Sequence, residues 1–487
     1  MNQNTPPQTH ILSNLAWKFL ERFGVQGLQF VIQIILARLL SPSDYGLLAL
    51  VVIFITIANV FVQSGLNTSL IQKKVVDNVD YSSVFYLSLG IASVLYLLLF
   101  LFAPSIASFY DNLGLIPVLR VLALTLFPGA FNSIQNAIVS RTMQFRRLFY
   151  SSTGAGLVSG IVGIALAYKG YGIWALVFQQ LTNQVCVTII LWFTVKWRPT
   201  LQFSFERVKA HFSFGWKLLV SSLIDTTYRD LRSLIIGKVY TPAMLGYYNR
   251  GQQFPQLVIT NINGSIQAVM LPALAAQQDY TERVKSMMRR SIVTSSFIVF
   301  PMMVGLAVVA EPLVVLLLTD KWLPAVPFLQ IFCFTYSLWP IHTANLQAIN
   351  AMGRSDIFLK LEIIKKIMGL VILFISLPFG VYYLALSGIV SGLISSFINA
   401  YPNKKLLNYG YGEQIKDIVP SLLLSLVMGV IVYFFSYFGF SPLVTMVLQI
   451  IAGVIIYVLL ALLFRLECFH YLINTVISLF KERRQTT

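Results

Sequence analysis

The sequence predicts an all-α integral membrane protein, in which about 14 transmembrane helices form two repeated six-helix lobes followed by two extra C-terminal helices. The composition, the placement of basic residues and an internal repeat predict this fold. Of the 487 residues, 57% are hydrophobic and 11% are charged, whereas soluble proteins carry about 25% charged residues. So little charge cannot cover a soluble surface, which excludes a soluble enzyme, a disordered protein and a single-span receptor.

Hydrophobic segments long enough to cross a bilayer recur along the whole chain. A transmembrane helix needs about 20 mostly apolar residues. Fourteen segments meet this requirement: 12–39, 43–66, 81–104, 116–139, 150–168, 171–195, 213–237, 243–272, 291–311, 325–349, 357–377, 380–402, 415–438 and 442–464. The connections between them are too short to fold as domains. The tail 465–487 is amphipathic, which predicts a segment on the cytoplasmic membrane surface.

Basic residues in the connections alternate between the two sides of the membrane, as the positive-inside rule requires. With the N-terminus in the cytoplasm, the cytoplasmic side holds 20 Lys and Arg residues and the outer side holds 4. The cytoplasmic set is Lys73, Lys74, Arg141, Arg146, Arg147, Lys196, Arg198, Arg207, Lys209, Arg283, Lys285, Arg289, Arg290, Arg354, Lys404, Lys405, Lys416, Lys481, Arg483 and Arg484, and the outer set is Arg38, Lys169, Lys238 and Lys321. Both termini are therefore predicted in the cytoplasm, and most of the net charge of +17 serves membrane insertion rather than nucleic-acid binding.

The chain repeats itself at a spacing of about 200 residues. The first predicted span ends in Ala37-Arg38-Leu39-Leu40-Ser41-Pro42-Ser43-Asp44-Tyr45-Gly46, and the seventh ends in Gly237-Lys238-Val239-Tyr240-Thr241-Pro242-Ala243-Met244-Leu245-Gly246. The basic residue, the hydroxyl-Pro pair and the glycine coincide. Residues 1–200 and 201–403 are therefore predicted to form two lobes of six spans each, and residues 404–464 add the last two spans. Because an odd span matches an odd span, the lobes share one orientation, as in some alternating-access transporters.

Polar residues inside the spans predict a water-filled cleft, because such side chains are costly against lipid. One face of the first span carries a polar stripe consisting of Lys18, Arg22, Gln26, Gln29 and Gln33. In the second span, Asn59, Gln63 and Asn67 form another polar line. Hydrogen bonding between helices is the alternative interpretation of the glutamines. For Arg22 the alternative is snorkelling to the headgroups.

The seventh span, which matches the first in the repeat, carries a charged face. Asp225, Arg229 and Arg232 follow one another at i, i+4 and i+7, and Asp225 is placed to pair with Arg229. A purely structural ion pair is the alternative interpretation. The eighth span carries Asn249 and Arg250 near its outer end.

Arginine outnumbers the acids along these stripes, and a guanidinium group binds phosphate in a bidentate manner. The sequence therefore predicts a cationic cavity for an anionic substrate that carries phosphate. The residues expected to bind the phosphates are Arg22, Arg229, Arg232 and Arg250. The residues expected to complete the cavity lining are Lys18, Gln26, Gln29, Gln33, Asn59, Gln63, Asp225 and Asn249.

No motif for catalysis or for metal binding is found. The sequence has no Walker motif, no HExxH, no CxxC and no nucleophile elbow, and its three cysteines are too scattered for a disulfide framework or a zinc site. The acids of the connections, Asp77 and Asp80 among them, form no convincing catalytic pair. The protein is therefore expected not to be an enzyme and to use no cofactor or metal. Tryptophans near the span ends, including Trp322, are expected at the membrane interface.

The sequence resembles the Wzx-type polysaccharide and lipopolysaccharide flippases, and particularly their colanic-acid-exporter-like subgroup. These flippases belong to the polysaccharide transporter family of the multidrug/oligosaccharidyl-lipid/polysaccharide exporter (MOP) superfamily. The segments that carry the resemblance are Ala37 to Gly46, Gln63 to Leu66, and Gly237 to Gly246 running into Tyr247-Tyr248-Asn249-Arg250. The resemblance implies fourteen helices in two lobes and a cationic central cavity. It also implies transport of an undecaprenyl-diphosphate-linked oligosaccharide from the cytoplasmic to the periplasmic leaflet of a bacterial inner membrane.

Two other functions stay open at this point. A multidrug exporter of the same superfamily would favour an acidic cavity for cationic drugs, and this sequence offers a basic one. A non-transporting membrane scaffold of a polysaccharide assembly complex would have no use for the polar stripes. The expected partners are the lipid-linked oligosaccharide, membrane lipid and a polysaccharide polymerase complex, and no nucleic acid.

Overall fold

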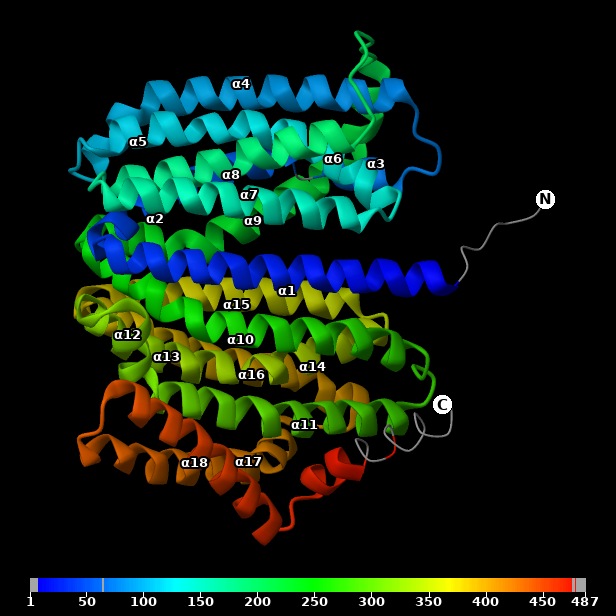
Figure 1. Cartoon of the computed structure of the whole chain (residues 1–487). Helices are drawn as coiled ribbons and strands as arrows, with labels where there is room; N and C mark the ends of the chain where they lie inside the picture. Colours follow the sequence, from blue (N-terminus) through cyan, green and yellow to red (C-terminus); the bar gives the residue numbers. More distant parts are fainter. Residues whose placement is uncertain (1–7, 64, 475–477, 479–487) are drawn as a thin grey trace. The chain divides into compact units, whose positions relative to one another are not determined.

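A computed structural model gives the structure of residues 8–63, 65–474 and 478, with side chains described from residue 23 onward (Figure 1). Every regular element in these residues is a helix. The contacts divide the chain into two compact units, Met1–Gly246 and Tyr247–Thr487. The helices of the first unit are α1 (Gln8–Leu39), α2 (Pro42–Gln63), α3 (Leu66–Gln72), α4 (Asn78–Phe109), α5 (Leu115–Leu122), η1 (Ala123–Thr125), α6 (Leu126–Arg141), α7 (Phe145–Tyr168), α8 (Ile173–Thr194) and α9 (Phe205–Val239).

The second unit begins within the second turn of α10 (Pro242–Ala275). Its other helices are α11 (Thr281–Val308), α12 (Ala310–Leu318), η2 (Asp320–Ala325), α13 (Val326–Ser337), α14 (Trp339–Ala351), α15 (Ser355–Ser376), η3 (Leu377–Phe379), α16 (Val381–Leu407), α17 (Tyr411–Tyr433), η4 (Phe434–Phe438) and α18 (Pro442–Leu463). The contacts place α9 in the first unit, whereas the sequence repeat assigns it to the second lobe. The division into lobes at residues 200 and 201 stays a prediction.

Ten helical stretches among the described residues are long and apolar enough to cross a membrane. Four of the fourteen predicted spans lie outside this set, each for a visible reason. The described apolar part of the first span is short (23–39), and α9 and α15 carry several charged residues. The span predicted at 325–349 is divided between α13 and α14 at Leu338. The chain is therefore a helical, multi-pass membrane protein, and the count of fourteen stays a prediction.

The repeated sequence motif forms the same helix start twice. Ser41 Oγ accepts a hydrogen bond from the Asp44 amide at 3.2 Å, and Asp44 Oδ2 accepts one from the Ser41 amide at 3.0 Å. This reciprocal capping, with Pro42 as the first helical residue, begins α2. In the second copy, Thr241 Oγ1 accepts from the Met244 amide at 3.3 Å at the start of α10. The hydroxyl-Pro pair of the motif is thus a helix-starting signal.

The two motif turns also pack against each other. A Cβ added at Gly46 would lie 1.7 Å from the carbonyl oxygen of Pro242, and one added at Gly246 would lie 2.1 Å from that of Pro42. Real Cβ atoms do not approach backbone atoms so closely. The glycines of the motif are therefore required because the two turns touch backbone to backbone.

Connections that were predicted on one side of the membrane meet at one end of the first unit. Arg141 donates hydrogen bonds to the carbonyl oxygens of Leu70 and Lys73, and Trp197 Nε1 donates to Asn78 at 3.0 Å. The connections predicted on the other side meet as well: Lys238 Nζ lies 2.9 Å from Asp111 Oδ2. The helices of this unit therefore alternate in direction as the charge pattern predicts, and the assignment of one end to the cytoplasm stays a prediction.

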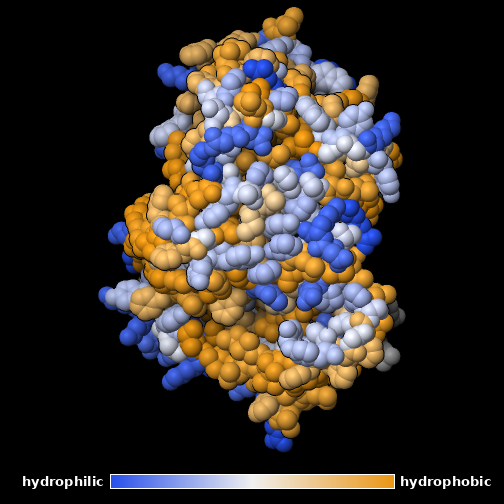
Figure 2. All heavy atoms as spheres, turned by 90° about the vertical axis from the view of Figure 1, so that its left-hand side faces the viewer, coloured by the Kyte–Doolittle hydropathy of each residue, from blue (hydrophilic) through white to orange (hydrophobic). Residues whose placement is uncertain are grey.

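Large apolar side chains are exposed along the sides of several helices. Hydrophobic residues also cover much of the face in Figure 2, which looks onto the left-hand end of the view in Figure 1. On α4, Val94 and Leu101 are 60% and 61% exposed, and on α18, Ile451 and Val454 are 53% and 62% exposed. Exposed apolar surface of this extent is costly in water and is satisfied by lipid tails. Polar side chains that serve transport would therefore lie on the other faces of these helices, which do not contact lipid.

Candidate functional site

The polar stripe of α1 runs beside α7. The side chains of Lys18 and Arg22 lie outside the described residues, while Gln26, Gln29 and Gln33 are half-buried. The Gln29 amide nitrogen would lie 3.4 Å from a Cβ at Gly156 of α7. Gln29 therefore packs at a helix–helix contact, as the alternative of hydrogen bonding between helices expects.

The polar line of α2 faces α6. Gln63 Nε2 donates to Asn59 Oδ1 at 3.3 Å. Both side chains crowd Gly129 of α6, where an added Cβ would lie 2.9 Å from Asn59 Oδ1 and 3.2 Å from Gln63 Nε2. These two amides occupy the inside of the first unit, and their role in lining a cavity stays a prediction.

The charged face of α9 is open. Asp225 and Arg229 are exposed and Arg232 is half-buried. Arg229 Nε lies 3.6 Å from Asp230 Oδ1, although the Arg229 side chain is still 60% exposed. A guanidinium so open is available to an anionic ligand. The carboxylate that approaches the Arg229 guanidinium is that of Asp230, although helical spacing places Asp230 well off the face that carries Arg229.

Arg250 of α10 belongs to the second unit and is buried at 6% exposure. Its Nη1 donates to Gln253 Oε1, and its guanidinium carbon lies 5.6 Å from the centre of the Trp322 ring. Asn249 beside it is half-buried. Trp322 is fully buried, so the expectation that it lies at the membrane interface is wrong: it covers an arginine inside the unit.

The predicted phosphate-binding arginines are thus distributed over both units. The first unit holds Arg229 and Arg232 on one helix, and the second holds Arg250. That these cations line one cavity stays a prediction. In the described part of the chain, no three His, Cys, Asp or Glu side chains are grouped closely enough to hold a metal ion.

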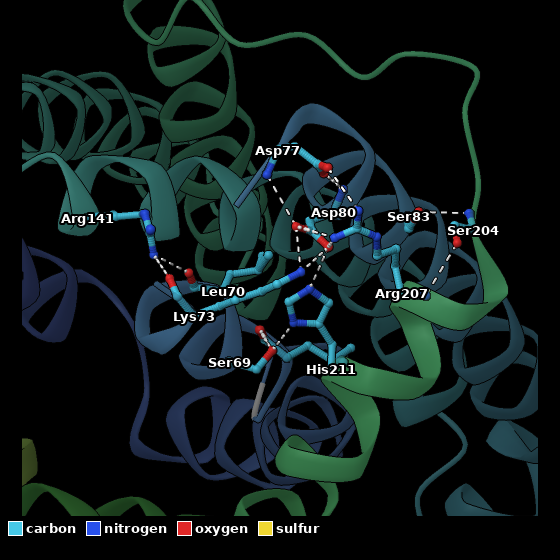
Figure 3. A network of polar contacts seen from close by, with 11 residues as sticks. Ser69, Leu70, Lys73, Asp77, Asp80, Ser83, Arg141, Ser204, Arg207 and His211 are labelled. Carbon is cyan, nitrogen blue, oxygen red and sulfur yellow. Dashed lines mark hydrogen bonds and ion pairs between the residues drawn. The ribbon is translucent and has the colours of Figure 1, made fainter. Parts of the chain in front are cut away.

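Sequence reasoning missed a group of charged residues at the other end of α9. Asp77 and Asp80 at the start of α4 meet Lys73, Arg207 and His211 (Figure 3). A local signal existed, because Asp77 and Asp80 form a capping box. The partners on α9 lie about 130 residues further along the chain, so no local pattern could reveal the group.

Comparison with known proteins gives relatives that match most of the chain. A family described as polysaccharide biosynthesis protein matches residues 35–327. The lipopolysaccharide biosynthesis protein WzxC of Escherichia coli K12 is 24% identical over 359 residues, which are 73% of each chain. The teichuronic acid biosynthesis protein TuaB of Bacillus subtilis 168 is 22% identical over 462 residues, 92% of this chain and 95% of that one.

Two kinds of solved structure share the fold. The lipid II flippase MurJ in an inward closed conformation superposes with a TM-score of 0.76 at 14% sequence identity, over 93% of this chain and 99% of that chain. An inward-facing multidrug resistance MATE transporter of the MOP superfamily superposes with a TM-score of 0.60 at 16% identity, over 78% of this chain and 95% of that chain. At these identities the likeness shows the fold.

Proposed function

Because the chain belongs to the polysaccharide biosynthesis protein family, whose match spans both copies of the repeated motif, we propose that it is a flippase for a lipid-linked oligosaccharide. The substrate is an undecaprenyl-diphosphate-linked repeat unit for lipopolysaccharide or exopolysaccharide synthesis. It moves from the cytoplasmic to the periplasmic leaflet of a bacterial inner membrane. Relatives named for lipopolysaccharide and teichuronic acid biosynthesis support this class of substrate, and a lipid II flippase shares the fold.

The observation that carries the proposal is the open cationic face of α9. Arg229 is 60% exposed on a helix of 35 residues, with Arg232 one turn further on. A bare diphosphate cannot enter hydrocarbon, because desolvating an unpaired charge is prohibitively costly. Guanidinium groups on a membrane-length helix replace the lost hydration with charge-assisted hydrogen bonds.

In the proposed mechanism, the diphosphate and sugars enter a cleft between the predicted lobes while the polyprenyl tail stays in lipid. The arginines Arg22, Arg229, Arg232 and Arg250 neutralise the diphosphate. Rocking of residues 1–200 against residues 201–403 then exposes the headgroup to the periplasm. Each unit of negative charge that moves outward across 100 mV, inside negative, gains about 2.3 kcal/mol. The membrane potential can therefore drive export of the headgroup.

The purified protein in vesicles tests the substrate class. A fluorescent undecaprenyl-diphosphate-linked oligosaccharide should cross the bilayer only in vesicles that contain the protein, and faster with the potential set to favour anion export. Collapsing the potential should slow the crossing, and an undiminished rate would remove the potential as driving force. Resistance to cationic drugs in cells, without flipping in vesicles, would favour the multidrug exporter. Absence of both, with intact polymer assembly, would favour the scaffold.

A further inference from the structure

The charged group at the start of α4 centres on a carboxylate that is fully buried. Lys73 Nζ lies 2.7 and 2.8 Å from the two Asp80 oxygens, and Arg207 Nη1 lies 3.3 Å from Oδ1. His211 Nε2 also lies 3.3 Å from Oδ1, and its Nδ1 lies 2.8 Å from Ser69 Oγ. The Asp80 side chain has 0% exposure and that of His211 has 3%. We call these five residues the Asp80 cluster (Figure 3).

The Asp80 cluster joins three parts of the first unit. Ser69 lies in α3, and Lys73 directly follows that helix; Asp80 lies in the first turn of α4; Arg207 and His211 lie in the first two turns of α9. The same junction holds the Ser204 amide, which donates to Ser83 Oγ at 3.0 Å. The end of α9 opposite the motif turns is therefore fixed to α3 and α4 by polar contacts.

The backbones also meet at this junction without side chains between them. Gly65 has a φ of 80°, and a Cβ there would lie 2.1 Å from the Gly215 carbonyl oxygen on α9. Separating such a contact exposes glycine backbone and charged groups, which water solvates readily, together with the buried side chain of Val208. The junction is thus held firmly while the Asp80 carboxylate is paired. Opening it costs less free energy than opening a junction held mainly by apolar side chains.

His211 makes the junction sensitive to protons. Both ring nitrogens face oxygen atoms, those of Asp80 and Ser69, so an imidazolium would donate to both. Lys73 and Arg207 oppose the extra positive charge, Asp77 adds a carboxylate at 3.2 Å from Arg207, and Arg141 of α6 holds the backbone of Lys73. Burial lowers the pKa of His211 below its ordinary value of 6.5, and outweighs the opposite effect of Asp80.

We propose that the Asp80 cluster is a releasable latch that holds one end of α9, and that Asp80 thereby acts as a positioning residue for Arg229 and Arg232. The role of those arginines rests on the proposed function, whereas the latch itself does not. Because α9 is one continuous helix from Phe205 to Val239, releasing its first turns lets the whole helix tilt. A helix that must present cations first to one side of a membrane and then to the other requires an attachment of this kind.

The sign of the pH effect follows from the His211 environment. With the latch closed, His211 binds a proton less readily than when it is exposed to water, so the closed state holds fewer protons. The closed state is therefore favoured above pH 6.5, and release is favoured as the pH falls below this ordinary value. One proton is linked, so the equilibrium changes by at most about tenfold per pH unit.

Cysteine labelling tests the latch without using transport. Val208 is 7% exposed on the latched face of α9, whereas its neighbour Lys209 is exposed. In full-length protein whose three native cysteines are replaced by serine, Val208→Cys should react with a maleimide much more slowly than Lys209→Cys, the matched control. Asp80→Asn removes the charged acceptor that Lys73, Arg207 and His211 share, so it should raise the Val208→Cys rate by at least about tenfold and leave the Lys209→Cys rate unchanged. An unchanged Val208→Cys rate would overturn the latch.

Two further variants keep the test decisive if Asp80→Asn does not fold. Ser83→Ala removes a neutral hydrogen bond from the same junction and should change the labelling rate by no more than about fivefold. Lowering the pH from 7.5 to 5.5 should raise the ratio of Val208→Cys to Lys209→Cys labelling, and His211→Gln should abolish this rise. A pH response that survives His211→Gln contradicts the latch. Failure of flipping in wild-type vesicles, with the labelling results as expected, would instead contradict only the proposed function.

Discussion

The first helices of the two sequence repeats, α1 and α9, are held in different ways. Along α1, Leu28 and Ile32 pack into α7 at Gly156 and Gly160, where added Cβ atoms would lie 3.0 and 2.6 Å from those side chains. The helix α9 is instead fixed near its two ends, by the Asp80 cluster and by the approach of Gly237 to Leu50. The apolar contacts hold α1 against α7 along its length, whereas the first turns of α9 are held by the polar contacts of the Asp80 cluster, which the proposed latch releases.

The largest effect is expected where the two motif turns of the first unit touch. Gly46→Val places a side chain against the Pro242 carbonyl oxygen, which an added Cβ would approach to 1.7 Å. The overlap involves backbone and cannot be relieved by a rotamer change, so we expect loss of most folded protein, at a cost of more than about 3 kcal/mol. Size-exclusion chromatography in detergent measures it. Gly27→Ala, where an added Cβ meets nothing within 4 Å, should express normally; equal yields would show that the turns need not touch.

A smaller effect is expected between α1 and α7. Gly160→Ala brings a Cβ to 2.6 Å from Ile32 Cδ1, the end of a flexible side chain. We expect a loss of about 1 kcal/mol, seen as a melting temperature a few degrees lower. The double variant Gly160→Ala with Ile32→Val removes the nearest clashing methyl group and should recover part of this loss, since the Cγ1 position at 2.9 Å remains occupied. A double variant less stable than Gly160→Ala alone would mean that the helices are not held by this fit.

The smallest effect is expected within the Asp80 cluster. Ser69→Ala removes the hydroxyl beside His211 Nδ1 and should cost about 1 kcal/mol. The Val208→Cys labelling rate should then rise by about fivefold. Because the latch opens locally before the first unit unfolds, the cost falls on this opening, and the melting temperature should fall less than in Gly160→Ala. A large fall in melting temperature would show that Ser69 contributes to the global stability of the unit, as the α1–α7 contact does. That result would contradict the contrast between α1 and α9.

Much of the fold could be predicted from the sequence, because hydrophobic runs, capping residues and loop charges are local signals. The Ser41-Pro42 and Thr241-Pro242 turns start helices as their residue types predict. The closeness of Gly46 to Pro242 could not be predicted, because it depends on how two distant turns pack.

The candidate site was less predictable for the same reason. Helical spacing correctly places Arg229 and Arg232 on one long helix, and correctly shows the amides of Asn59 and Gln63 in line. Helical spacing cannot show which face of a helix is covered by neighbouring helices. In the structure, Gln29 packs beside α7, and Trp322 covers Arg250. The partners of Asp80 on α9 are separated from it by about 130 residues, so only the three-dimensional structure brings them together.

The central claim is that the open cations of α9 carry the anionic headgroup, and the flipping rate of Arg229→Gln with Arg232→Gln tests it most directly. Each substitution removes a charge-assisted contact of about 1.5–3 kcal/mol, so the pair should slow flipping in vesicles by about 100-fold or more. The melting temperature should change little, because Arg229 is 60% exposed. Lys169→Gln, an exposed cation on the connection between α7 and α8, should flip at the wild-type rate. A wild-type rate in the double arginine variant would contradict the account.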